Sequence, residues 1–430
     1  MRDDGAVTPS TTRALPRAPW GPDAATAAAL VVTTAVVWAV AKMVAIWAWV
    51  LATGEYGDTY YYLLTAEEAA RSGGGIATAF REYPTPAGLL LLLPYELGAT
   101  HHDQYRAAIL VMTTIADAAF TVLLGRRTGP IGVLAWVALT GALGQLALLR
   151  FDMLPAVVAG AAVLLALEHR RVAAAVLVAV GTGLKAWPLV LAPLVVARRR
   201  RWQPLAALAA TGLALVAGSV AIGGWTRLLS PLGFQGERGL QVEAVAATLP
   251  MWAWAGDQSH LVWYSTFNAY ELIGPSVDRW LAFAQVATVV GFVGCVALLV
   301  WWFRRGANPA ALGWLALLLI GTFIVTSRAL SPQYLLWLAA PAAVLLGVAF
   351  RGGRNAPPLV PALATFAGVL VLCALTTAIY PVHYAGLIER GDVTDRALVL
   401  LTLRNVGLLA LVAWSAACAW ATSRRPVDAA

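Results

Sequence analysis

Residues 54–86 form a polar stretch between long apolar runs, and they include residue types that could act on a hydroxyl group. Asp58 lies near the start of this stretch. A carboxylate can take the proton of a hydroxyl group while the hydroxyl oxygen attacks an electrophilic carbon. We therefore predict that Asp58 is a catalytic base. Polar and aromatic side chains of the same stretch are predicted to bind the substrate: Tyr60, Tyr61, Glu82 and Tyr83.

Only two of the 30 basic residues are lysines, Lys42 and Lys185, and both lie in apolar segments. A charge in such a segment is energetically costly and usually has a function. Lys185 also precedes the helix-breaking Pro188. Cations stabilise the negative charge that builds up on a departing phosphate. We expect Lys185, together with Arg238 or Arg328, to bind a phosphate group.

The composition places these residues in a membrane protein. Hydrophobic residues make up 60% of the chain and charged residues 12%, with a net charge of +8. Apolar runs of about 16 to 27 residues recur along the whole length, as a hydrocarbon core roughly 30 Å thick requires. The basic residues form short clusters between these runs, which is typical of cytoplasmic loops. The positive charge is therefore explained by the cytoplasmic loops of a membrane protein, and no nucleic-acid partner is expected.

The apolar runs predict an all-α polytopic membrane protein with about 12 transmembrane helices. A short run at 87–98 precedes the second span, and 172–197 is expected to form a hairpin of two short helices that dips toward the outer face. The predicted spans are 25–52, 107–124, 130–149, 153–168, 204–223, 279–302, 309–327, 333–349, 359–380 and 397–420.

Alternation of these spans places all arginine clusters on one face, which the positive-inside rule assigns to the cytoplasm. The protein is thus expected in the cytoplasmic (plasma) membrane with both termini inside. The predicted organisation is a tail at 1–23, one transmembrane domain at 24–422 and a tail at 423–430. Two long loops, 54–86 and 224–278, would lie outside, and the second would cap the membrane surface.

With this topology, carboxylates, cations and aromatic residues gather on the outer face. Further substrate contacts are predicted there: Asp152, Gln241, Glu243, Gln333 and His383. This combination suits the attack of an acceptor hydroxyl on a sugar that a lipid phosphate carries. No metal or other cofactor is expected if the cations hold the leaving monophosphate.

Structural roles are alternatives for several of these residues. Asp58 could cap the helix that follows it, because Asp is favoured at that position. Lys42 could form an ion pair with Asp117, and Lys185 could extend toward the membrane interface. Asp152 could pair with Arg150. Arg238 and Glu243 could form a salt bridge. His260 and His383 could lie at the membrane interface without a catalytic role.

The order of several short motifs resembles that of the polyprenyl-phosphate-dependent glycosyltransferases of the GT-C superfamily. More narrowly, the chain is similar to glycosyltransferase family 87, which includes mycobacterial α-mannosyltransferases. The motifs that carry this resemblance are Asp58, Tyr60 to Tyr62, Gly73 to Gly75, Tyr83-Pro84, Arg150-Phe151-Asp152, Lys185 with Pro188, Arg238-Gly239-Leu240-Gln241 with Glu243, Ser331-Pro332-Gln333-Tyr334 and Arg404-Asn405.

The resemblance implies a GT-C-type fold with an outer-face active site and Asp58 as the base. It also implies a membrane-embedded donor such as polyprenyl-phosphate-mannose, an acceptor that is a glycolipid or a glycan, and contact with membrane lipids. The chain departs from the acidic pair of some GT-C enzymes, because Thr59 follows Asp58. The alternatives from other classes are a lipid or sugar transporter and a non-catalytic subunit of an envelope assembly.

Overall fold

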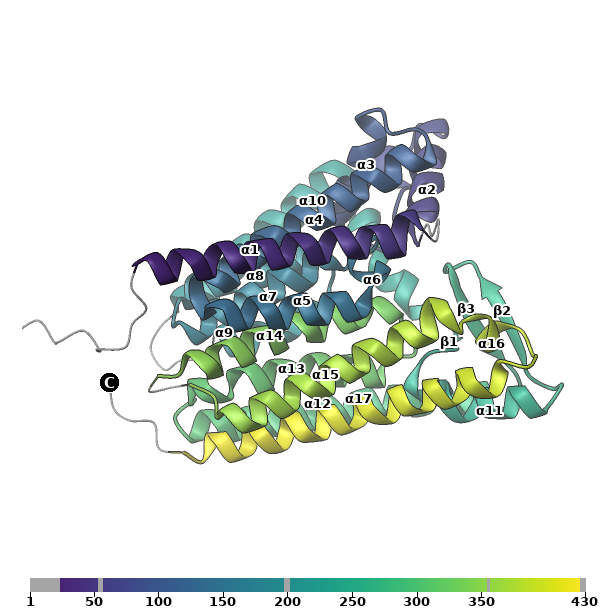
Figure 1. Ribbon diagram of the computed structural model, residues 1–430. Coiled ribbons are helices and arrows are strands. Elements are labelled where there is room, and N and C mark those ends of the chain that lie inside the picture. Colours follow the sequence, from purple (N-terminus) through teal and green to yellow (C-terminus); the bar gives the residue numbers. More distant parts are fainter. Residues whose placement is uncertain (1–23, 53–56, 197–201, 354–355, 426–430) are drawn as a thin grey trace, which may run out of the picture.

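The computed structural model describes residues 24–52, 57–196, 202–353 and 356–425 (Figure 1). The predicted tail at 1–23 lies outside the described residues. So do the arginine run at 198–201 and the last residues of the predicted C-terminal tail, 426–430.

The described residues are mostly helical, because a backbone in hydrocarbon must form its hydrogen bonds within its own segment. Eight of the described helices are long and apolar enough to cross a membrane, and four further apolar helices are shorter. These findings confirm an all-α polytopic membrane fold. The long helices are α1 (Ala24–Ile46, continued by a π-helical turn at Trp47–Leu51), α4 (His102–Thr128), α10 (Gln203–Gly236), α12 (Val277–Arg304), α13 (Leu312–Thr326), α14 (Leu335–Arg351), α15 (Leu359–Thr377) and α17 (Thr394–Ser423). The four shorter ones are α5 (Pro130–Leu143), α7 (Met153–Leu167), α8 (Arg171–Leu184) and the segment Trp187–Val196, which ends in α9 (Ala192–Val196). The bundle also contains the single turn α6 (Gln145–Leu148).

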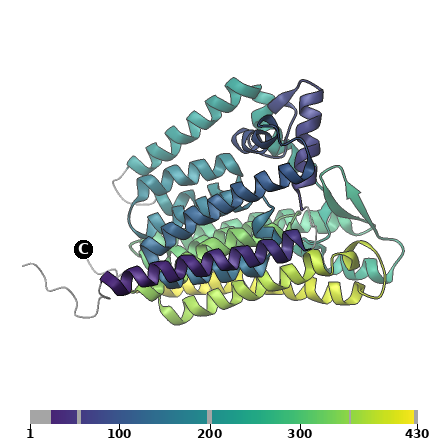
Figure 2. The same ribbon diagram turned by 45° about the horizontal axis from the view of Figure 1, so that its top comes forward.

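The remaining elements gather at one end of the bundle, which we term the cap end (Figures 1 and 2). They are α2 (Thr59–Arg71), α3 (Thr85–Glu96), β1 (Leu240–Gln241), α11 (Thr248–Gly256), β2 (Leu261–Ser265), β3 (Ala269–Ile273) and α16 (Ala385–Ile388). At the opposite end, arginine-rich loops meet. There Arg127 forms a 3.1 Å ion pair with Glu168, and Arg351 donates to the backbone carbonyl of Arg127.

The cap segment differs from the predicted loop in two respects. The helix that was expected to end at residue 223 continues to Gly236 across a kink at Gly224, where φ is 74°. Glycine adopts this φ without steric cost. The cap also contains a small antiparallel sheet of strand order β1-β3-β2, with Tyr264 opposite Tyr270. The hydropathy pattern predicted only helices and irregular structure here.

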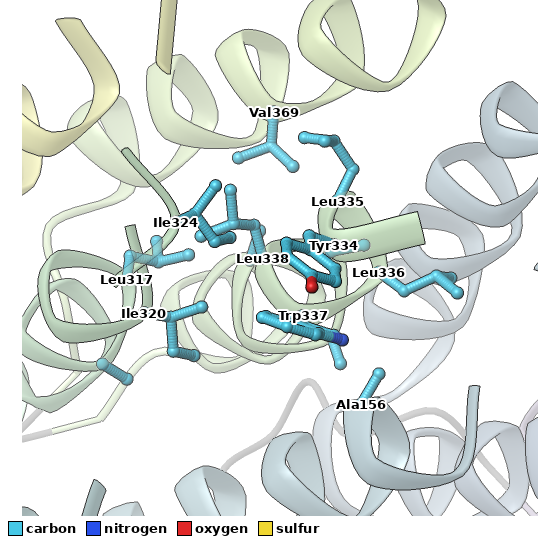
Figure 3. Packing of buried hydrophobic residues seen from close by; sticks show 14 of the residues in the cluster. Ala156, Leu317, Ile320, Ile324, Tyr334, Leu335, Leu336, Trp337, Leu338 and Val369 are labelled. Atoms are coloured by element: carbon cyan, nitrogen blue, oxygen red, sulfur yellow. The ribbon is translucent and has the colours of Figure 1, made fainter. Parts of the chain in front are cut away.

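Helices α13 and α14 form the centre of the bundle. In the membrane-spanning window of each, 89% of the residues are buried. Figure 3 shows Trp337 and Leu338 of α14 beside Ile320 and Ile324 of α13. The Trp337 ring stacks on Tyr334 with centroids 3.9 Å apart. A close-packed interior of this kind is rigid. The first turn of α14 is therefore a firm support for side chains at the cap end.

Helix α1 is fixed to the bundle by a buried polar cluster. The Lys42 ammonium lies 3.2 Å from an Asp117 carboxylate oxygen, which confirms the expected ion pair. The indole nitrogens of Trp38 and Trp136 donate to the same carboxylate at 2.6 and 2.7 Å. Lys42 also donates to the Thr140 hydroxyl at 2.9 Å. Because each buried charge has partners, the cluster links α1 to α4 and α5.

The hairpin expected at 172–197 is present. Helix α8 ends at Leu184, and Lys185 has extended backbone angles of φ −158° and ψ 140°. A 3-10 turn at Trp187–Leu191 and α9 then lead back. The break in the helix places Lys185 at the tip of the hairpin, which faces the cap end.

Candidate functional site

A cavity of about 470 Å³ opens at the cap end. Its wall includes eight of the chain's 12 tyrosines, so much of its surface combines an aromatic face with a hydroxyl group. Such side chains suit a ligand that has both apolar faces and polar edges. The tyrosines are Tyr60, Tyr61, Tyr83, Tyr264, Tyr270, Tyr334, Tyr380 and Tyr384.

Asp58 lines this cavity immediately before α2. Its side chain makes no capping hydrogen bond to the helix, so the capping alternative is wrong. Instead, the carboxylate forms an ion pair with Arg150. The Arg150 guanidinium also donates to the Tyr380 hydroxyl at 3.0 Å and lies 5.3 Å from the centre of that ring. Arg150 therefore links Asp58 to Tyr380, which lies in the π-helical turn at Ala378–Val382 that continues α15.

Lys185 reaches the cavity from the tip of the hairpin. Its ammonium group donates to both Asp152 carboxylate oxygens, at 2.7 and 2.9 Å. Asp152 is fully buried and also accepts from the Trp337 indole at 2.8 Å. The expected alternative pair, Asp152 with Arg150, is wrong, because Lys185 occupies that carboxylate.

Three aromatic rings surround the same ammonium group. The centres of the Tyr83, Tyr334 and Trp337 rings lie 5.3 to 5.5 Å from the Lys185 nitrogen. Aromatic faces attract a cation at this distance. Lys185 is thus a fixed positive charge in the floor of the cavity.

Arg238 is the third cation of the cavity wall. It donates to the backbone carbonyl of Phe267 at 3.3 Å, and its guanidinium lies 5.4 Å from the centre of the Phe234 ring. Arg328, which was predicted to contact a phosphate, does not line the cavity. It donates to the backbone carbonyls of Gly236 and Arg238 at 3.2 and 3.1 Å. Arg328 therefore supports the loop that carries Arg238.

Some polar atoms of this wall have no hydrogen-bond partner among the described residues. They are buried, and they belong to three cavity-lining side chains: Nε of Arg238, Oε1 of Gln241 and Oε1 of Gln333. A native protein rarely leaves buried polar atoms unsatisfied unless a ligand or water reaches them. This makes the three side chains candidates for ligand contact.

Glu82 and the tyrosines around it form a hydrogen-bonded group beside Asp58. The Tyr61 hydroxyl donates to Glu82 at 2.6 Å, and the Tyr62 and Tyr83 hydroxyl groups lie 3.2 Å apart. Burial, followed by the charge of Glu82, raises the pKa of Tyr61 above its usual value. Burial and the charge of Asp152 likewise raise the pKa of Tyr83. Both phenols therefore stay protonated and can donate hydrogen bonds.

Three predicted contacts lie behind the wall or away from it. Asp152 is buried beneath Lys185, as described above. Glu243 is fully buried and forms a 2.8 Å ion pair with Arg404, so the expected salt bridge with Arg238 is wrong. His383 does not line the cavity, and its ring nitrogen lies 2.8 Å from the carbonyl of Ala378. Burial against an oppositely charged partner explains why these two carboxylates have no surface in the cavity.

The prediction also missed residues that the tertiary structure brings to the cavity. Arg150 was noted as a possible partner for Asp152 and as part of the Arg150-Phe151-Asp152 motif, but it was not predicted as a site residue. The cap hairpin contributes Tyr264, Asn268 and Tyr270, and α10 contributes Gln235. The aromatic residues of 262–272, a type enriched in strands, could have indicated the sheet. No group of three or more metal-binding side chains was found among the residues that the structure describes.

Comparison with known proteins gives a family match. Residues 82–332 match the pattern of Glycosyltransferase family 87. None of the curated proteins matches the sequence. Among solved structures, the chain is similar to crystal structures of ArnT from Cupriavidus metallidurans. The form bound to undecaprenyl phosphate has a TM-score of 0.42 and 14% identity, with 94% of this chain and 78% of that chain covered. The apo form has a TM-score of 0.44 and 15% identity, with 93% of this chain and 78% of that chain covered.

Proposed function

This chain belongs to glycosyltransferase family 87, and from that premise we propose that it moves a sugar from a polyprenyl-phosphate donor to a hydroxyl group of an envelope glycolipid or glycan. It is a glycosyltransferase and a multi-pass membrane protein. The proposed sugar is mannose, as in the α-mannosyltransferases that the sequence resembles. The proposed site of reaction is the outer face of the cytoplasmic membrane, with both termini inside.

One observation carries this proposal. Asp58 and three cationic side chains, Arg150, Lys185 and Arg238, open onto one cavity at the cap end of the bundle. A base for the acceptor and positive charges for the leaving group are the two requirements of this transfer. The tyrosine-rich wall supplies surfaces that suit a sugar ring.

In the proposed reaction, Asp58 takes the proton of the acceptor hydroxyl group. The acceptor oxygen then forms a bond to the anomeric carbon of the donor sugar, and the bond between that carbon and the phosphate oxygen breaks. The electron pair of the broken bond stays on the polyprenyl phosphate. Attack opposite to the leaving group inverts the configuration at the anomeric carbon.

The three cations differ in whether they have a carboxylate partner, which suggests separate roles in holding the phosphate. Arg150 and Lys185 already have carboxylate partners, Asp58 and Asp152. Arg238 has no ion-pair partner among the described side chains and keeps an unpartnered Nε atom. We assign Arg238 as the first contact of the donor phosphate, with Lys185 as a fixed charge beside it. Arg328 would act through the backbone that it supports.

The base is tested by Asp58→Asn in protein reconstituted into liposomes with polyprenyl-phosphate-mannose and a membrane glycolipid fraction. We expect transfer, measured by mass spectrometry of the products, to fall by roughly a thousandfold, because proton transfer by a positioned group contributes about 10²–10⁴. Asp257→Asn is the matched control, since Asp257 is an exposed acid of the cap outside the cavity. Full activity of folded Asp58→Asn protein would refute the assignment.

The sugar is tested in the same liposomes with donors that carry mannose, glucose or arabinose. We expect a mannosylated product. Transfer of arabinose or glucose, abolished in Asp58→Asn protein, would overturn the assignment of mannose and leave the assignment of the base intact.

A further inference from the structure

A second hollow, of about 460 Å³, adjoins the Asp58 cavity along helix α2. We call it the α2 groove. Five of its residues belong to α2, Ser72 is the residue that ends this helix, and Thr78 belongs to the following turn. The seven lining residues are Tyr61, Leu64, Thr65, Glu68, Ala69, Ser72 and Thr78. Tyr61 and Leu64 also line the Asp58 cavity. The two hollows therefore meet at these side chains.

The spacing of the groove residues shows that they follow one face of α2. Positions 61, 64, 65, 68, 69 and 72 recur every three or four residues, which is the repeat of one side of a helix. Helix α2 has 13 residues, so this face is about 20 Å long at 1.5 Å per residue. The groove thus starts at the Asp58 cavity and leads along α2 away from it.

The lining of the groove is rich in hydroxyl groups. The hydroxyl groups of Thr65, Ser72 and Thr78 donate to backbone carbonyls at 2.9, 3.3 and 3.3 Å. The Ser72 oxygen also accepts from the Gly74 backbone N–H at 3.4 Å, and because a hydroxyl oxygen has two lone pairs, each of the three oxygens can still accept a hydrogen bond from a ligand. The Glu68 carboxylate, whose side chain is 67% exposed, forms a 3.3 Å ion pair with Arg71 through one oxygen and adds its other oxygen as an acceptor. A ligand with many hydroxyl donors fits such a row of acceptors.

The walls between these acceptors are apolar, from Leu64, Ala69 and the Tyr61 ring. Alternating polar and apolar contacts match a carbohydrate chain, whose sugar rings have hydroxyl edges and apolar faces. An isoprenoid chain has no donors for the hydroxyl and carboxylate oxygens of this groove. The lining therefore favours a glycan over the lipid of the donor.

We propose that the α2 groove binds the sugar units that precede the reacting sugar of the acceptor. The acceptor is accordingly a glycan chain of several sugars rather than a single sugar on a lipid. This assignment rests on the proposed function, because it takes the Asp58 cavity as the place of transfer. It specifies the substrate class of that site.

The experiment uses Ser72→Trp and Thr78→Trp, which place bulk in the groove from two different elements. Both positions are exposed, so either variant is expected to fold. Ala70→Trp is the matched control, since Ala70 is exposed on α2 and lines neither hollow. The acceptors are octyl glycosides of mono-, di-, tri- and pentamannose.

For the wild-type protein and Ala70→Trp, we expect kcat/KM to rise by at least about tenfold from mono- to pentamannoside. In Ser72→Trp and Thr78→Trp this rise should be lost, with transfer to the monomannoside retained. A wild-type kcat/KM independent of acceptor length would overturn the proposal. So would an equal loss for the monomannoside and the pentamannoside, or a higher KM for the polyprenyl donor in the groove variants.

A binding measurement separates this proposal from the proposed function. The pentamannoside and the monomannoside are titrated by calorimetry into Asp58→Asn protein in nanodiscs, with and without Thr78→Trp. Tighter binding of the longer acceptor that depends on Thr78 supports the groove even if no mannose is transferred. Equal binding of both acceptors overturns the groove even if Asp58 is the base.

Discussion

At the scale of single residues, the ion pair between Asp58 and Arg150 is the central feature of the candidate site. Arg150 is 6% exposed and spans from the Asp58 carboxylate to the Tyr380 hydroxyl. A guanidinium group has several donors in a fixed planar arrangement, so it can contact both groups at once. In the proposed reaction, Arg150 would hold Asp58 ready to accept a proton and would fix its direction.

Replacement of Arg150 tests this positioning role. We expect Arg150→Gln to lower kcat/KM by roughly 100-fold, the size of effect that removal of one fixed electrostatic group has. The loss should appear in kcat more than in KM, because Arg150 directs the base in the proposed reaction. The measurement is kcat and KM for the donor and the acceptor.

Arg150→Lys serves as the control for Arg150→Gln. It keeps the charge but not the fork that contacts Asp58 and Tyr380 together. We expect kcat to lie between those of the wild-type protein and Arg150→Gln. A wild-type kcat in folded Arg150→Gln protein would contradict the positioning role of Arg150.

At the scale of elements, one arginine fixes the loop that carries Glu82 and Tyr83. Arg227 of α10 is 1% exposed. It donates to the backbone carbonyls of Ile76, Tyr83 and Phe80 at 2.9, 2.9 and 3.2 Å. The kink at Gly224 precedes this arginine by less than one helical turn. Helix α10 thus holds one wall of the cavity through a single side chain.

Loss of the hydrogen bonds from Arg227 to this loop should affect both the stability of the fold and substrate binding. In Arg227→Gln, buried carbonyl groups lose their donors, at a cost of about 1–3 kcal/mol for each group left unsatisfied. We expect a lower midpoint of thermal unfolding and a higher KM, with a smaller change in kcat. Arg81→Gln is the control, because Arg81 is an exposed arginine of the same loop. Equal behaviour of the two variants would contradict the role of Arg227.

At the scale of the whole molecule, polar side chains divide between the two ends of the bundle. The cap end holds the cavity and the α2 groove, and the paired arginine loops lie at the opposite end. Figures 1 and 2 show the sheet at the cap end. The positive-inside rule assigns the arginine-rich end to the cytoplasm. Donor and acceptor would then both reach the site from the outer face.

Cysteine labelling of intact cells tests this orientation. The native Cys295, Cys373 and Cys418 are buried, so they give little background. We expect a membrane-impermeant maleimide to label Ser259→Cys, which is exposed at the cap end. Arg305→Cys, exposed at the opposite end, should be labelled only after the cells are lysed. The reverse pattern would invert the topology and place the site in the cytoplasm.

The sequence alone determined the membrane class, the position of several long helices and the partner of Lys42. Its apolar runs predicted α12 at 279–302 and α17 at 397–420, each within about three residues of the observed ends. This works because a backbone in hydrocarbon has few ways to form its hydrogen bonds, so that length and hydropathy fix the element. The same rule explains why a lysine and an aspartate in neighbouring spans had to pair.

Only the tertiary structure decided which charges meet at the cap end. Hydropathy gives the depth of a residue in the membrane but not its direction from the bundle axis. The Coulomb attraction between two charges depends on a distance of a few ångströms between them. Rotation of a helix about its axis changes this distance, and the spacing of residues in the sequence does not reveal that rotation. Asp152 therefore pairs with Lys185, Glu243 pairs with Arg404, and Arg150 is left to hold Asp58. The cap sheet escaped prediction for a related reason, since strands as short as β1 are stabilised by their neighbours rather than by their own residues.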